Sequence, residues 1–97
     1  MATLTLVEWD GVTQQQYEAL RRLVNWEGDS PKGLSFHIAA FDEKGGHFVD
    51  LWETAEEFQV FIESRLMPGA KQVGIQGEPR AQMYPVHALF TPGYRSA

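Results

Sequence analysis

Apolar and polar residues alternate near the start of the chain and again in two runs around its middle. Residues 3–9 read TLTLVEW, and residues 34–41 and 47–53 are equally rich in β-forming side chains. A period of two is typical of strands with one buried face. The turn-rich segment DEKGG at 42–46 separates the second run from the third. The pattern therefore predicts three strands, of which the last two form a hairpin.

Two other segments have the spacing of amphipathic helices. A capping-box pattern precedes each of them, T-x-x-Q from Thr13 and T-x-x-E from Thr54. The apolar stripe of the first is Tyr17, Leu20, Leu23 and Val24, and that of the second is Phe58, Phe61, Ile62 and Leu66. We expect one helix at about 13–25, and another that starts after Thr54 and is interrupted at Met67-Pro68-Gly69, with one more short turn at residues 70–73 as an open alternative.

Residues 81–89 predict a fourth strand, and Pro85 lies inside it. Proline cannot donate to a strand ladder, so this strand is at an edge, is bulged, or ends early. The order β-α-β-β-α-β predicts an α+β fold of the ferredoxin-like type, a four-stranded antiparallel sheet with two helices on one face. We expect residues 1–90 to form this single domain and residues 91–97 to form a C-terminal tail.

Two helices on one face leave the other face of the sheet open. A chain of 97 residues buries a modest share of its surface, and large apolar side chains on an open face need a cover. A second copy of the chain is the simplest cover. The expected assembly is a homodimer in which two sheets form an α/β barrel.

Composition excludes several classes of partner. The formal charge is −5, and Arg21-Arg22 is the densest basic pair, so no nucleic-acid partner is expected. No apolar run is long enough to span a membrane, and the N-terminus lacks a signal-peptide pattern. These features predict a soluble cytoplasmic protein without a membrane partner.

The sequence also lacks the common cofactor and metal motifs. It has no cysteine, and its three histidines, at 37, 47 and 87, have no metal-ligand spacing. The glycines do not form a phosphate-binding loop between a strand and a helix. We therefore expect no metal and no cofactor.

The hairpin carries a histidine, a carboxylate and an indole on its most strand-like segments. If the hairpin turn consists of two residues, Lys44 and Gly45, odd-numbered residues of the first strand share a face with even-numbered residues of the second strand. One face would then hold Ser35, His37, Ala39, Phe41, Phe48, Asp50 and Trp52, and the other would hold Leu34, Phe36, Ile38, Ala40, Val49 and Leu51. The second set is more apolar, so we expect it to pack on the helices. The mixed set should then face the partner subunit.

The candidate site residues follow from this partition. His37 and Asp50 would form a catalytic pair in which the imidazole acts as general base, with Tyr84 as a catalytic hydrogen-bond donor. Trp52, His87 and Tyr17 are the candidate ligand-binding residues. A structural role is the alternative for each: an ion pair satisfied within an interface, core aromatic packing, or a contact between subunits.

The whole of residues 3–90 resembles the dimeric α/β-barrel superfamily. The strand ending VDLWET and the helix AEEFQVFIESRLMP are similar to its antibiotic-biosynthesis-monooxygenase-like branch. The segments VEWDGVTQQQYEAL and YPVHALF resemble small bacterial proteins of that branch. Trp52 matches the branch's tryptophan at the end of strand three. Ile62 stands where heme-degrading relatives carry a histidine, and Leu4-Thr5-Leu6 stands where an asparagine is common in strand one.

The resemblance implies a cofactor-independent enzyme, similar to monooxygenases, that acts on a small apolar or aromatic molecule. Such enzymes deprotonate an electron-rich substrate that then reacts with oxygen directly. The alternative is a non-catalytic dimeric module that binds a small molecule or a protein. A purely structural accessory domain is a third interpretation.

Overall fold

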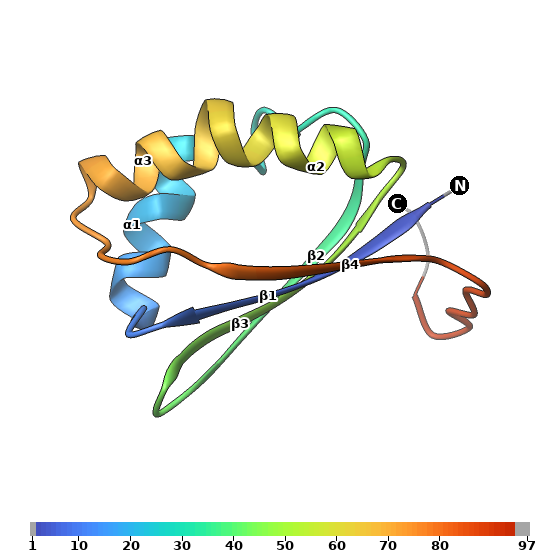
Figure 1. Cartoon of the computed structure of the whole chain (residues 1–97), viewed down its shortest axis with the longest axis horizontal. Coiled ribbons are helices and arrows are strands. Elements are labelled where there is room, and N and C mark those ends of the chain that lie inside the picture. The colour runs from blue at the N-terminus through green and yellow to red at the C-terminus, as the bar shows by residue number, and fades with distance from the viewer. Residues whose placement is uncertain (1, 95–97) are drawn as a thin grey trace.

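One antiparallel sheet carries every helix on a single face (Figure 1). The computed structural model describes residues 2–94. Its elements are, in order, β1 (Thr3–Asp10), α1 (Gln14–Val24), β2 (Leu34–Asp42), β3 (Gly45–Trp52), α2 (Ala55–Phe61), the π-helical segment η1 (Ile62–Leu66), α3 (Met67–Gln72) and β4 (Arg80–Pro85). The predicted βαββαβ order and α+β class are confirmed. None of the described helices is long and apolar enough to cross a membrane.

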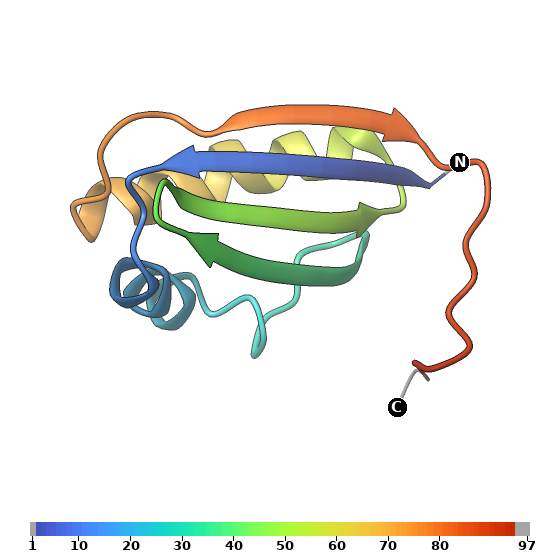
Figure 2. The same cartoon turned by 90° about the horizontal axis from the view of Figure 1, so that it is seen from below.

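The strands follow the order β2-β3-β1-β4, so β2 and β4 are the edges. Figure 2 shows the four strands from the helix-free face. Pro85 is the last residue of β4, which is therefore shorter than the predicted 81–89. The edge position allows this proline, because one side of an edge strand needs no donors.

The β2–β3 hairpin has the predicted even turn, one residue earlier than expected. Asp42 pairs with Gly45, so Glu43 and Lys44 form the turn. The Asp42 carboxylate accepts hydrogen bonds from the backbone N–H groups of Lys44 at 2.8 Å and Gly45 at 3.2 Å, as Asp does in many turns. This turn gives the predicted division of the hairpin residues between the two faces, and His37 lies directly opposite Asp50.

A β-bulge lies at the start of β2. The register shifts between Leu34 and Phe36, so Ser35 has no partner in the ladder. An extra residue reverses the facing of what precedes it. Leu34 consequently shares the helix-covered face with Trp52, rather than the face of Phe36 and Ile38 to which alternation along β2 assigned it.

Helix α1 begins where its sequence predicts. Thr13 is the N-cap, and its hydroxyl accepts a hydrogen bond from the Gln16 backbone N–H at 3.1 Å, while Gln16 Oε1 accepts from the Thr13 backbone N–H at 3.1 Å. Asn25 ends the helix in the left-handed conformation, with φ of 58°. This capping at both ends fixes the direction in which the next loop leaves the helix.

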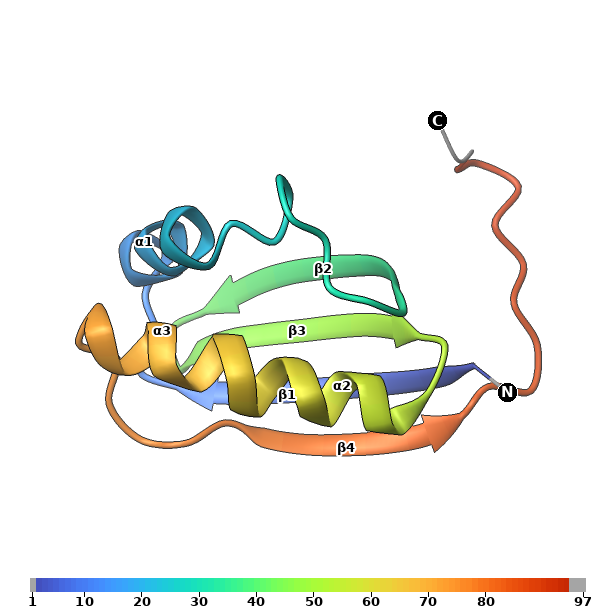
Figure 3. The same cartoon turned by 90° about the horizontal axis from the view of Figure 1, so that it is seen from above.

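The second helical region does not end at Met67-Pro68-Gly69. Thr54 caps α2 as predicted, with Glu57 N–H donating to its hydroxyl at 3.1 Å, but the chain stays helical through Gln72 (Figure 3). The Met67 N–H reaches back five residues to the Ile62 carbonyl, a π turn. Pro68 then falls in the first turn of α3, where its missing N–H costs no intrahelical bond.

The structure reverses the predicted assignment of the two sheet faces. Trp52 is 0% exposed and Phe48 is 9% exposed, and both pack beneath the helices with Leu20, Phe58 and Phe61. The more apolar set is on the helix-free face, where Ile38 is 54% exposed. Large aromatic rings bury more area than the branched aliphatic residues of the other face, which favours the observed choice. His37 and Asp50 therefore lie beneath the helices.

Candidate active site

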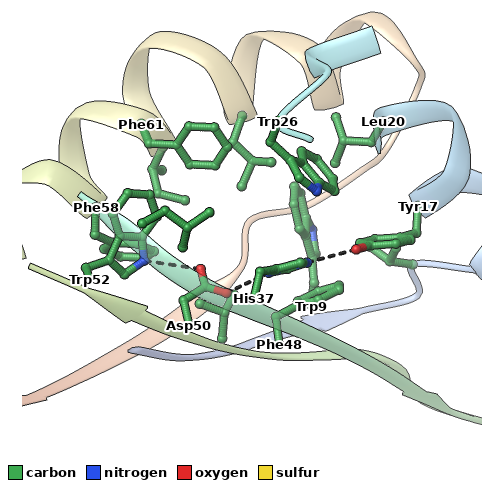
Figure 4. Close-up of a pocket in the computed structure, with 15 residues that line it drawn as sticks. Trp9, Tyr17, Leu20, Trp26, His37, Phe48, Asp50, Trp52, Phe58 and Phe61 are labelled. Carbon is green, nitrogen blue, oxygen red and sulfur yellow. Dashed lines mark hydrogen bonds and ion pairs between the residues drawn. The ribbon is translucent and has the colours of Figure 1, made fainter. Parts of the chain in front are cut away.

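A cavity lies between the helices and the sheet, over β3 and β1. Its volume is about 50 Å³, and its apolar wall includes Trp9, Leu20, Trp26, Phe48, Phe58 and Phe61. Figure 4 shows these rings around a row of polar groups. A water molecule needs a cavity of at least about 10–15 Å³, and a cavity that binds benzene is about 150 Å³. The space therefore fits a small molecule, and an aromatic ring requires the walls to move apart.

Four side chains form one continuous hydrogen-bonded chain along the cavity (Figure 4). Trp52 Nε1–H donates to Asp50 Oδ2 at 3.2 Å. Asp50 Oδ1 lies 2.6 Å from His37 Nδ1. His37 Nε2 lies 2.8 Å from the Tyr17 hydroxyl. These groups come from three elements, α1, β2 and β3, so the tertiary fold assembles them.

The partners determine where the protons lie. An ionised carboxylate only accepts hydrogen bonds, so Nδ1 of His37 carries a hydrogen and donates it to Asp50. In the neutral imidazole, Nε2 is then an acceptor, and the Tyr17 O–H donates to it. Asp50 therefore fixes the tautomer that leaves a basic nitrogen facing Tyr17.

Aromatic rings hold the His37 imidazole in place. The Phe48 ring is nearly parallel to it, with a centroid distance of 6.0 Å and an interplanar angle of 14°. Trp26 meets it edge-on at 5.6 Å. With both nitrogens bonded as well, the imidazole has a single orientation, as a positioned base requires.

The charge distribution in the cavity is one-sided. Asp50 carries the one carboxylate of the lining, and no lysine or arginine lines it. Burial raises the pKa of the Tyr17 hydroxyl to about 12, because the phenolate is disfavoured where water is scarce. Tyr17 is thus a neutral hydrogen-bond donor at physiological pH.

Stability is expected to fall at alkaline pH because of Tyr17. Its pKa is raised in the folded protein above its ordinary value of 10.0, so the folded state holds this proton more tightly than the unfolded state does. Unfolding should become easier between about pH 10 and pH 12, by roughly 2–3 kcal/mol at most. Urea melts at pH 8 and pH 11 measure the loss. Tyr17→Phe should show a smaller loss over the same range, and an equal loss in both proteins would contradict this assignment.

The structure brings together four of the six residues predicted for the site. His37, Asp50, Trp52 and Tyr17 line the cavity. Tyr84 does not, because it pairs with Leu4 on the helix-free face and is 48% exposed. His87 follows the end of β4 and is exposed. Neither residue lines this cavity, so their predicted roles do not belong to this site.

Trp9 is a lining residue that sequence reasoning missed. It is 3% exposed, and its Nε1–H donates to the Gln76 carbonyl at 3.3 Å. Alternation along β1 places it on the face of Thr5 and Val7, which was the available signal. Among residues 2–94, no group of three His, Asp or Glu side chains is placed to hold a metal ion.

Solved structures share this fold at low sequence identity. No family model and no curated protein sequence matches the chain. SnoaB from Streptomyces nogalater, a cofactor-independent oxygenase, has 9% identity and a TM-score of 0.61 over 91% of this chain and 94% of its own. The ActVA-Orf6 monooxygenase from Streptomyces coelicolor, solved with nanaomycin D, has 13% identity and a TM-score of 0.60 over 95% and 92%.

A third match catalyses a different reaction. The hydroxynitrile lyase from Passiflora edulis has 10% identity and a TM-score of 0.59 over 92% of this chain and 96% of its own. One fold thus carries at least two chemistries. The chain has the ferredoxin-like fold of antibiotic-biosynthesis-monooxygenase-like proteins, and its own side chains must identify its function.

Proposed function

We propose that this chain is a cofactor-independent, monooxygenase-like enzyme that acts on a small apolar or aromatic molecule. The observation that carries the proposal is the Tyr17–His37–Asp50–Trp52 chain of hydrogen bonds inside an apolar cavity. A carboxylate-held imidazole is a common general base. An apolar wall excludes water, which strengthens the electrostatic interactions within the site.

The residues divide the chemical work as follows. The His37–Asp50 pair receives a proton from the substrate, and the Asp50 carboxylate stabilises the imidazolium that forms. Trp52 holds the second carboxylate oxygen in place. The aromatic walls, including Trp26 and Phe58, bind the apolar body of the substrate.

Dioxygen would be the second substrate, and the carbanion or phenolate left by deprotonation would supply the electrons. For a substrate whose methylene group becomes a carbonyl, O₂ adds to the carbon as a hydroperoxide. One oxygen atom stays in the product, and the other leaves as water with the two hydrogens of the methylene. The balance needs no metal or flavin. The structural similarity to SnoaB, a cofactor-independent oxygenase, and to ActVA-Orf6, a monooxygenase, supports this choice.

One observation favours the non-catalytic alternative. The four polar groups satisfy one another without a ligand, which is also what a structural network in a core requires. A binding module with this cavity would take up a small apolar molecule and release it unchanged.

Oxygen uptake distinguishes the two functions. The purified protein, without added metal or flavin, is mixed with a panel of phenols and other small enolisable compounds, and an oxygen electrode records consumption. An enzyme should consume oxygen with at least one compound and release an oxidised product in equal amount. Binding seen in a thermal shift, with no uptake across the panel, would overturn the oxygenase and leave the binding module.

The assembly proposed for this enzyme is a homodimer joined through the helix-free face. That face presents Leu4, Leu6, Phe36, Ile38 and Val49 on neighbouring strands, and none of the helices covers it (Figure 2). Phe90, in the segment after β4, is a further exposed aromatic residue, at 86%. Contiguous apolar surface of this kind usually marks an interface.

Ile38→Glu is expected to convert the dimer to a monomer. Its side chain is 54% exposed on the helix-free face, and a buried charge without a partner opposes association. Light scattering at micromolar concentration should give twice the chain mass for the wild type and about half of that for the variant. Val60→Glu is the control, because Val60 is 61% exposed but belongs to α2 on the other side of the sheet. A monomeric wild type would contradict the barrel.

A further inference from the structure

We propose that the Tyr17 hydroxyl, and not the His37 ring, takes the proton directly from the substrate, and that the pocket therefore selects small neutral hydroxyl compounds such as phenols and enols. The inference rests on the proposed function, because it assigns the first step of that reaction. Its basis is the way in which the hydrogen-bonding capacity of His37 and Tyr17 is used.

His37 has no free nitrogen. Its Nδ1 is 2.6 Å from Asp50 Oδ1, and its Nε2 is 2.8 Å from the Tyr17 hydroxyl. An imidazole has two nitrogen sites for hydrogen bonds. A substrate can therefore reach the basic nitrogen only if Tyr17 moves away, and Tyr17 is held by packing against Trp26 and Phe48.

Tyr17 still has capacity to accept. A phenolic oxygen donates one hydrogen bond and accepts up to two. Its hydrogen goes to His37, and no other hydrogen bond is formed by this oxygen among the described residues. Tyr17 lines the cavity. A hydroxyl group on a bound substrate would thus find an acceptor in Tyr17.

The transfer conserves atoms and charge. The substrate O–H bond breaks, and its proton goes to the Tyr17 oxygen. The Tyr17 O–H bond breaks at the same time, and that proton goes to His37 Nε2. The products are a substrate oxyanion, a neutral Tyr17 and an imidazolium paired with Asp50. Because both protons move together, no tyrosinate forms, and the raised pKa of Tyr17 does not oppose the step.

Charge in the cavity sets the substrate class. Asp50 is the one carboxylate of the lining, and no lysine or arginine accompanies it there. Two arginines of the helical layer have partners elsewhere: Arg21 pairs with Glu18 and Glu27, and Arg65 donates to the Val24 and Asp29 carbonyls. An anionic ligand would bring a second negative charge without a counter-ion. A neutral hydroxyl compound avoids this cost until the proton has moved.

Space limits the size. With about 50 Å³ available, even one aromatic ring must displace part of the wall. Ile62 and Leu66 on η1 are half-buried lining residues. Fused polycyclic ligands would need a far larger displacement, so compounds of one ring or smaller are expected to bind.

Nitrophenol binding tests the relay. 4-Nitrophenol is added below its own pKa, where it is neutral, and absorbance reports the phenolate formed on the protein. The wild type should form phenolate, and Tyr17→Phe should form at least tenfold less while still quenching tryptophan fluorescence on binding. Phenolate formation at the wild-type level in Tyr17→Phe would show that the Tyr17 hydroxyl is not required for proton transfer, which overturns the relay and leaves the proposed function intact. 4-Nitrobenzoate, of similar size but anionic, should bind at least tenfold more weakly, and equal binding would overturn the selectivity.

A second measurement does not depend on the variant folding. The rate of oxygen uptake, or of phenolate formation, is measured for the wild type in mixtures of H₂O and D₂O. If two protons move in the same step, a plot of the rate against the deuterium fraction should be curved. A linear plot would overturn the relay. Absence of both phenolate formation and oxygen uptake with every hydroxyl compound would overturn the relay and the proposed function together.

Discussion

Asp50→Asn is expected to lower oxygen-dependent turnover by about 10²–10⁴-fold, the usual contribution of a general base. The substitution keeps the size of the side chain. Its amide can still accept from Trp52 Nε1, which reaches Asp50 at 3.2 Å. The change is therefore in protons rather than in packing, and the fold should survive it.

The loss follows from the tautomer of His37. The asparagine amide can donate a hydrogen bond to Nδ1, which then needs no hydrogen of its own. The hydrogen moves to Nε2, which becomes a donor toward Tyr17 and can no longer accept a proton. The negative charge that stabilises the imidazolium is also lost. Both effects act on the same step, so they should appear in kcat.

Steady-state oxygen uptake with the best compound of the panel measures the effect. Glu63→Gln is the matched control, because it also exchanges a carboxylate for an amide, on the exposed surface of η1. It should retain wild-type turnover. Asp50→Asn with turnover within twofold of wild type would show that the carboxylate has no part in catalysis. Circular dichroism should show that both variants remain folded.

Local signals predicted the elements and their pairing. Capping patterns at Thr13 and Thr54 lie at the observed helix starts. The even turn placed His37, Asp50 and Trp52 on one face, and the structure confirms this. These features depend on residues close in sequence, where hydrogen bonding and side-chain alternation decide the result.

The choice of sheet face could not be predicted in the same way. Alternation divides a strand into two sets but does not say which set lies under the helices. Counting aliphatic residues favoured the set with Ile38 and Val49, whereas the helices cover the set with Trp52 and Phe48. Because the second face of this sheet is also apolar, the number of aliphatic residues does not identify the face that the helices cover. Polar residues can lie on the helix-covered face because their hydrogen bonds are satisfied there.

The helix boundary at Pro68 shows a second limit. Proline and glycine in sequence usually end a helix. Just before the proline, the Met67 N–H donates to the Ile62 carbonyl in a π turn. This turn changes the backbone hydrogen-bond pattern of the helix ahead of Pro68. Packing supplies the reason to continue, because Gly69 and Ala70 on α3 are buried. A Cβ added at Gly69 would lie 2.7 Å from Val24 of α1, so this glycine permits the two helices to approach closely.

Trp52→Ala is expected to lower the free energy of unfolding by about 3–5 kcal/mol, in the range for truncation of a buried large aromatic residue. Trp52 is 0% exposed. Its ring packs against Phe58 and Phe61, with centroid distances of 5.7 Å to each. These contacts connect β3 to α2, so the cavity left by alanine would lie between sheet and helix.

Two variants separate the packing from the hydrogen bond. Trp52→Phe keeps an aromatic ring and removes the N–H that Asp50 accepts, so it should cost less, about 1–3 kcal/mol. Val60→Ala, at a side chain that is 61% exposed, should change stability by no more than about 0.5 kcal/mol. Urea melts of the four proteins at pH 7 and one concentration give the differences. For a domain of this size, 3 kcal/mol lowers Tm by roughly 12–24 °C. A loss below about 1 kcal/mol for Trp52→Ala would mean that Trp52 does not anchor the sheet to α2, and that the floor of the proposed active site is not where the structure places it.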